Sequence, residues 1–180
     1  MTRIQSYVRR GLRRFLSEKG AASVELVIVF PFFVAVFLSA FDVAMMNMRA
    51  VMLERSMDIV VRQIRLSGGA TLDYDQVKAD ICSQAALIPD CANALKIELT
   101  VVNTTSWNGL QHRPACVDRR QTIQPIGSFR NGQENELMLM RLCAVVDPIF
   151  PGIGVGRSMP KDASGGYQII ASTAFVNEPK

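Results

Sequence analysis

Two residues near the N-terminus have the spacing for a proteolytic cut followed by an ion pair. Gly20 ends a basic segment, and Glu25 is the one acid in the apolar segment that follows. A carboxylate in a membrane-length apolar helix costs about 2.5–3.5 kcal/mol unless something neutralises it. Cleavage after Gly20 would make Glu25 the fifth residue and would free an amine at Ala21. We expect that amine to pair with the corresponding carboxylate of a neighbouring subunit.

Four cysteines could supply disulfide chemistry. Cys82, Cys91, Cys116 and Cys143 all lie downstream of the apolar segment. An even number of cysteines in an exported domain favours disulfides, and the first two lack the tight CxxC spacing of a zinc or redox site. Three pairings are possible. We favour Cys82–Cys91 with Cys116–Cys143, because the first pair closes a short loop at a predicted helix end; four buried free thiols are the alternative.

No other residues form a recognisable catalytic or ligand-binding pattern. His112 is the single histidine and lies in a loop, where a solvated side chain is the ordinary state. No serine–histidine–aspartate set can be argued from it. Gly152, Gly154 and Gly156 lack the third spacing of a dinucleotide fingerprint. The sequence therefore predicts no catalytic residue, no metal site and no cofactor.

The loop 149–153 is unusually apolar, with the sequence IFPGI. An exposed apolar loop is typical of a contact with a partner or with a membrane surface. Alternatively, the loop folds over the protein's own core. The sequence leaves both interpretations open.

Charge is distributed unevenly along the chain. The formal net charge is +4, but residues 1–20 contain six basic side chains and one acidic side chain, so the remainder is slightly negative. The body has no basic cluster of the kind that binds nucleic acid, and we expect no nucleic-acid partner. A basic leader followed by an apolar segment predicts a leader in the cytoplasm and a body outside the membrane.

The apolar segment predicts a membrane anchor. Leu26 to Phe41 carry no charge, and with residues 21–24 the segment reaches about 20 residues, the length that spans about 30 Å of hydrocarbon. The segment is long for the apolar region of a signal peptide, and no good small-x-small cleavage site follows it. Pro31 falls inside this helix, where it removes a backbone donor and predicts a kink.

The helical pattern continues beyond the anchor. Apolar residues recur at three-, four- and seven-residue spacing as far as Ile64, and Gly68-Gly69 predicts the end of the helix. We expect one helix of about 45 residues, from near Ala22 to Leu66, which is roughly 65–70 Å long. Its amphipathic second half must pack against the body. The apolar stripe consists of Met46, Leu53, Met57, Val60 and Ile64, and Arg49 is assigned to the polar face.

The body alternates between helical and strand patterns. Residues 72–88 predict a second helix, ended by Pro89-Asp90, and residues 94–103 predict a half-buried strand. A long mixed segment, 103–135, follows, in which 115–123 could form a short or edge strand. The remaining expected elements are a strand at 136–146, a loop at 148–166 and a last strand at 167–176.

These elements predict an α+β fold of the pilin-like kind. It has a long N-terminal transmembrane and amphipathic helix, a second short helix, and a small antiparallel sheet of three to four strands. We divide the chain into a leader at 1–20, the long helix at 21–67 and an external α+β body at 68–180.

Segment 20–31, GAASVELVIVFP, resembles the start of TadE-like proteins. These are the minor pilins, or pseudopilins, of the tight-adherence (Tad/Flp) pilus system, and they show a glycine, small residues, a glutamate, an apolar run and an early proline. Ala21 stands where a type IVa pilin has phenylalanine. Leu26 stands where the major Flp pilin has an aromatic residue, and the body is much larger than in that protein. Both departures point to a minor subunit.

The resemblance implies a function and a set of partners. A prepilin peptidase would remove the leader after Gly20. The mature helix would then pack with other major and minor pilins on an inner-membrane assembly platform, and the pilus would serve surface adhesion. The protein would be an enzyme's substrate and not itself an enzyme. It would cross the inner membrane once, with a cytoplasmic N-terminus and a periplasmic body, and could end in an extracellular pilus.

Two other functions remain open at this stage. One is a membrane scaffold of a secretion or pilus apparatus that crosses the bilayer once and keeps its leader. The other is an exported soluble protein, released by signal peptidase near Ala40 or Ala44. The position of the mature N-terminus distinguishes all three.

Overall fold

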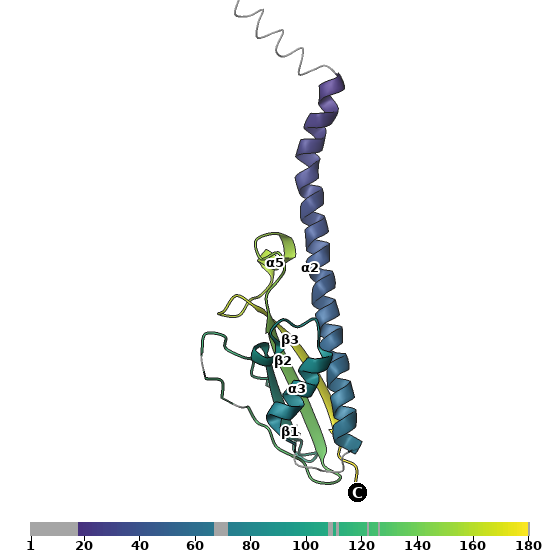
Figure 1. Ribbon diagram of the computed structural model, residues 1–180, viewed down its shortest axis with the longest axis vertical. Coiled ribbons are helices and arrows are strands. Elements are labelled where there is room, and N and C mark those ends of the chain that lie inside the picture. The colour runs from purple at the N-terminus through teal and green to yellow at the C-terminus, as the bar shows by residue number, and fades with distance from the viewer. Residues whose placement is uncertain are drawn as a thin grey trace, which may run out of the picture.

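A computed structural model describes residues 18–66, 72–107, 110, 112–121, 123–125 and 127–179. Most of the predicted leader and the predicted helix stop Gly68-Gly69 lie outside the described residues. The longest element is α2 (Glu18–Leu66), which begins four residues before the predicted start and continues through Pro31. Its first half extends away from the body, and its second half lies along the sheet (Figure 1).

The second predicted helix is shorter than expected and is followed by another. Helix α3 spans Tyr74–Gln84, and Asp73 caps its start by accepting a hydrogen bond from Gln76 N at 3.1 Å. It ends well before Pro89, because the chain turns at Ala85. Helix α4 (Cys91–Ala94) is a single turn that the sequence did not predict. Such a turn is too short to show an apolar periodicity.

The sheet has three strands in the order β1-β2-β3, and both neighbouring pairs are antiparallel. Its strands are β1 (Leu95–Val101), β2 (Leu137–Val146) and β3 (Tyr167–Val176). The last strand has the bounds that alternation predicted. The predicted α+β fold with a small antiparallel sheet is therefore confirmed.

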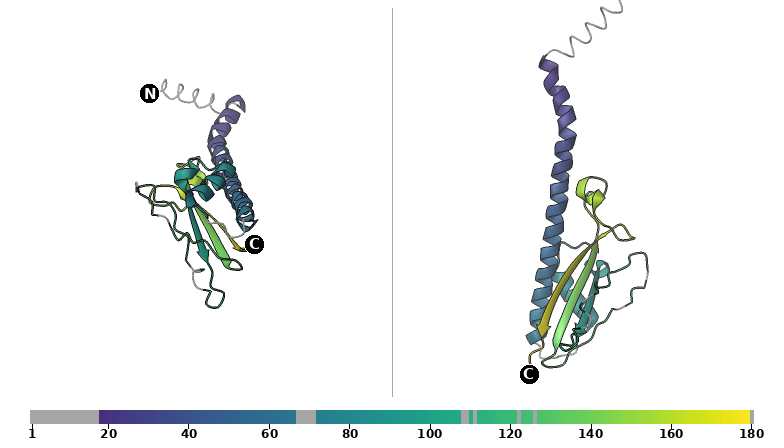
Figure 2. Two further views of the ribbon diagram at one scale, coloured as in Figure 1. Left: turned by 60° about the horizontal axis from the view of Figure 1, so that its bottom comes forward. Right: turned by 180° about the vertical axis from the view of Figure 1, so that it is seen from behind.

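Helices α2 and α3 cover one face of the sheet (Figure 2). The apolar stripe of α2 is buried from Leu53 to Ile64, and Val77 and Ile81 of α3 join it. The sheet contributes the alternate residues of each strand, such as Ile97 and Leu142. Strand β3 is buried on one face and alternates accordingly, which is why its pattern was readable in the sequence, whereas β2 is buried on both faces from Met140 to Val146.

The long segment between β1 and β2 covers part of the opposite face of the sheet, over β2, whereas outward side chains of β3 such as Ile170 stay exposed. Phe129, within this segment, forms an isolated parallel bridge to Leu99 at the free edge of β1. The predicted edge strand at 115–123 is wrong for the residues that the structure describes. Asp118 instead accepts hydrogen bonds from Arg120 N and from the Gln121 side chain, and such local bonds favour a turn over a strand.

The segment between β2 and β3 also differs from the expected loop, because it contains helix α5 (Gly154–Ser158). This helix lies beside α2, beyond the end of the sheet (Figure 1). We call residues 148–160 the α5 loop. It includes the apolar stretch 149–153, which lies against α2 and not over the core of the body.

Candidate functional site

The projecting half of α2 is the most exposed apolar surface of the described chain. Between Val24 and Phe41, most of its large apolar side chains are exposed, by 43% to 72%. This helix is long and apolar enough to cross a membrane. Apolar surface of this length costs too much to leave in water, so it requires a bilayer or other helices around it.

The predicted processing residues lie at the far end of this half. Gly20 and Ala21 fall within the first turns of α2, remote from the sheet (Figure 1). Glu25 is exposed, and within the described residues no hydrogen bond or ion pair reaches its carboxylate. Pro31 is also exposed, and α2 is unbroken there. A carboxylate on an apolar helix surface is available to a group from another molecule.

Arg49 fixes α2 to the end of the sheet. Its Nη1 donates to the backbone oxygen of Asp147 and to the hydroxyl of Tyr167, at 2.9 Å each. The side chain is buried, so its assignment to the polar face of the helix was wrong. The sequence contained the relevant signal: Arg49 follows Met46 by three residues and precedes Leu53 by four, which places it on the apolar stripe.

Asp42 makes the second polar contact between α2 and the body. Its Oδ1 accepts hydrogen bonds from the backbone N–H groups of Ile149 and Phe150, at 3.0 and 3.3 Å. The side chain is 4% exposed. Sequence reasoning missed this residue, because its partners are backbone groups more than 100 positions away.

Asp147 has two arginine partners. Its backbone oxygen accepts the hydrogen bond from Arg49, and its side chain pairs with Arg119. The Arg119 guanidinium makes two hydrogen bonds to the Asp147 carboxylate, at 2.9 and 2.7 Å. These bonds hold the pKa of Asp147 below its usual value, against the opposing effect of burial. Arg119 also donates to Ser164 Oγ, so it connects the long segment to the loop before β3.

A polar cluster lies on the outer face of the sheet. Arg141 of β2 is 5% exposed, and its Nη2 lies 3.2 Å from Glu98 of β1. Its Nη1 donates to the backbone oxygen of His112 at 2.7 Å. The His112 side chain is 60% exposed, as expected of a solvated loop histidine, and its Nε2 lies within hydrogen-bond distance of Arg141 Nη2 and of Glu98 Oε1. The cluster links β1, β2 and the long segment.

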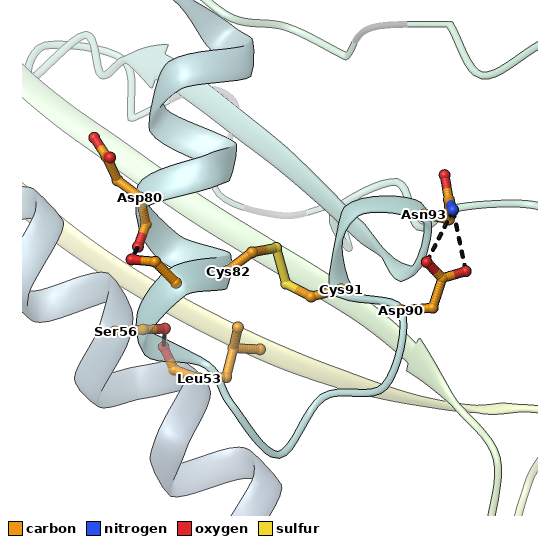
Figure 3. Close-up of a disulfide and its surroundings, with 8 residues drawn as sticks. Leu53, Ser56, Asp80, Cys82, Asp90, Cys91 and Asn93 are labelled. Carbon is orange, nitrogen blue, oxygen red and sulfur yellow. Dashed lines mark hydrogen bonds between the residues drawn. A yellow bond between two sulfur atoms is a disulfide. The ribbon is translucent and has the colours of Figure 1, made fainter.

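Both disulfides of the favoured pairing are present. Cys82 at the end of α3 is bonded to Cys91 at the start of α4, which ties the two short helices together (Figure 3). Cys143 of β2 is bonded to Cys116 of the long segment. All four cysteines of the sequence lie within the described residues, and each is bonded.

An open cavity of about 840 Å³ lies between α3, α4 and the ends of β1 and β2. Charges of both signs line it, including Lys78 and Lys96 as well as Asp75 and Asp90. Burial lowers the pKa of Lys78, and the neighbouring Asp75 opposes that shift. Within the described residues, no group of three histidine, cysteine, aspartate or glutamate side chains could hold a metal ion.

The exposed half of α2 lies within a segment that is similar to a known protein family. Residues 20–62 match the family model described as TadE-like protein. Over this segment the chain is similar to TadE-like proteins. The recognition made from segment 20–31 is thereby confirmed, and the match extends it along both halves of α2. No curated protein and no solved structure matches the chain.

The TadE-like match connects this chain to Tad pili and to their other components. TadE-like proteins are a structural kind of pilus-associated protein. The match covers Gly20, Ala21, Glu25 and Pro31, and it ends before α3. The sheet, the disulfides and the α5 loop are thus features of this chain that lie outside the matched segment.

Proposed function

We propose that this protein is a minor pilin, or pseudopilin, of a Tad-type (type IVc) pilus, made as a precursor and cleaved between Gly20 and Ala21. The TadE-like match carries the proposal, because it begins at Gly20 and follows the exposed helix. A prepilin peptidase is the enzyme required. The large body, bonded by two disulfides, supports a minor subunit over a main filament subunit.

The proposed topology places the leader in the cytoplasm, the first half of α2 across the inner membrane and the body in the periplasm. The basic residues of segment 1–20 support this orientation. The disulfides agree with it, since they persist in the oxidising periplasm and not in the cytosol. The exposed apolar surface between Val24 and Phe41 is the part that the bilayer would cover.

Glu25 is proposed to join one subunit to the next. After cleavage, the new Ala21 amine and the Glu25 carboxylate of a neighbouring pilin would neutralise each other in an apolar environment. The exposed position of Glu25 on α2 supports an intermolecular partner. Pro31, six residues further on, would provide a point of bending when the subunit leaves the bilayer for the pilus, because the helix lacks one backbone donor there.

Substitution of Glu25 by alanine tests this role. We expect Glu25→Ala to leave cleavage intact and to reduce incorporation into pili by roughly a hundredfold, since an unpaired amine among apolar helices costs about 2.5–3.5 kcal/mol. The measurement is the fraction of mature protein in sheared pili compared with membranes. Glu54→Ala is the matched control, because Glu54 is an exposed acid on the amphipathic half of the same helix. Normal incorporation of Glu25→Ala would remove the assigned role.

A further inference from the structure

The α5 loop is held against α2 at a defined point. Asp42 accepts two backbone hydrogen bonds from the start of this loop, and the rings of Phe41 and Phe150 meet edge to face with centroids 6.1 Å apart. Figures 1 and 2 show α5 beyond the sheet and beside the helix, on the side toward the projecting half.

Two glycines make the close approach possible. Gly154 has a φ of +56°, and a Cβ added there would overlap Ser39 Oγ. A Cβ at Gly156 would lie 2.7 Å from Asp42 Oδ2 and would also overlap the backbone oxygen of Phe150. Gly152, by contrast, has no atom within 4 Å of such a Cβ. The α5 loop is therefore fitted to α2 between Ser39 and Asp42, and does not merely lie near it.

This contact falls at the expected edge of the bilayer. Twenty helical residues, from Ala21 to Ala40, rise about 30 Å, which is the thickness of the hydrocarbon core. Ser39 and Asp42 thus mark the level at which α2 leaves the hydrocarbon on the side of the body. The α5 loop lies at that same level.

The chemistry of the α5 loop suits this position. Ile149 and Ile153 are 38% and 46% exposed, and Phe150 between them in the sequence packs on Phe41 of α2. Arg157 of this loop is exposed, and so is Lys161, which follows the loop directly and donates a hydrogen bond back to the Pro151 backbone oxygen. Apolar side chains accompanied by basic ones are typical of segments that lie in a membrane interface, where the cations meet lipid phosphates.

We propose that the α5 loop is a membrane-interface contact that binds the phospholipid headgroup region on the body's side of the bilayer. Together with α2 it attaches the protein to the membrane at two points, which fixes the height and tilt of the body relative to the bilayer while the subunit is in the membrane. The inference rests on the proposed insertion of α2.

Depth-dependent fluorescence quenching tests this proposal on the full chain. The sole tryptophan is removed by Trp107→Phe, and a single probe is introduced by Ile153→Trp, Phe33→Trp or Ile123→Trp. Each protein is reconstituted in phosphatidylcholine–phosphatidylglycerol vesicles whose acyl chains carry bromine near the headgroup or deeper. Ile123 is the matched control, because it is an apolar residue, 82% exposed, in the long segment.

We expect shallow bromines to remove roughly half of the Ile153→Trp emission, since interfacial segments lie about 5–10 Å into the headgroup boundary. The Ile123→Trp emission should stay unchanged, and Phe33→Trp should be quenched by the deeper bromines. Adding Gly154→Ala should reduce the quenching of the Ile153→Trp probe, whereas Gly152→Ala should not.

Quenching at Phe33→Trp without quenching at Ile153→Trp would overturn this inference and leave membrane insertion intact. Absence of quenching at Phe33→Trp would contradict insertion itself, and with it the proposed function. A blue shift of Ile153→Trp that appears only at high protein density, without bromine quenching, would assign the α5 loop to contacts between copies and would also overturn the inference.

Discussion

At the scale of single residues, two buried charged side chains on α2 determine where the helix meets the body. Asp42 and Arg49 are seven residues apart, or about two helical turns, and so lie on one face of the helix. Asp42 accepts hydrogen bonds from backbone N–H groups of the segment that leaves β2, and Arg49 donates to a backbone oxygen of that segment and to the Tyr167 hydroxyl of β3. A buried charge is tolerated when it is hydrogen-bonded, and its loss leaves the partners unsatisfied.

Arg49→Ala should lower the free energy of unfolding by about 2 kcal/mol, because the Tyr167 hydroxyl and the Asp147 carbonyl both lose a charged donor. The measurement is urea unfolding of the full chain in detergent micelles, followed by near-ultraviolet circular dichroism. Arg62→Ala is the control, since Arg62 is exposed on the same helix and should change stability by less than about 0.5 kcal/mol. Equal effects of the two substitutions would contradict the role given to Arg49.

At the scale of elements, the parts with a long regular period were predictable from the sequence. The alternation of β3 and the apolar stripe of α2 gave nearly correct bounds, since one face of each packs on the core. The unpredicted parts depend on distant partners. Helix α4 is one turn tied to Cys82, Phe129 pairs with Leu99 across a long segment, and α5 depends on its fit against Ser39.

The candidate site divides in the same way. Gly20, Ala21 and Glu25 are proposed from the sequence alone, because a processing site is recognised by local spacing along one helix. Arg49 was assigned to the wrong face, although its spacing from Met46 and Leu53 placed it on the buried stripe. Nothing local identified Asp42, whose role depends on the backbone of the α5 loop.

The two disulfides should differ in their contribution to stability. Cys116–Cys143 closes a loop across 27 positions and Cys82–Cys91 across 9. Loop-closure entropy then gives about 3.5 kcal/mol for the longer loop and about 2.5 kcal/mol for the shorter one. Replacing both cysteines of each pair by alanine, followed by chemical unfolding under oxidising conditions, checks this order. A larger loss from the Cys82–Cys91 pair would contradict it.

At the scale of the whole molecule, one helix serves two environments. Its second half completes the core of the α+β body, and its first half exposes apolar surface on a helix that is long enough to cross a membrane. The α5 loop lies at the boundary between the two. This organisation lets a folded body stay outside the membrane while its helix passes from bilayer to filament, which is the behaviour proposed here for a Tad minor pilin.

The mature N-terminus tests the central claim most directly. It is read from the intact mass of the protein recovered from native membranes. The account predicts a chain that begins at Ala21, which prepilin-type cleavage after Gly20 would produce. A chain that begins at Met1 would contradict cleavage and favour an uncleaved membrane scaffold, and a start beyond Ala40 would contradict the pilin proposal altogether.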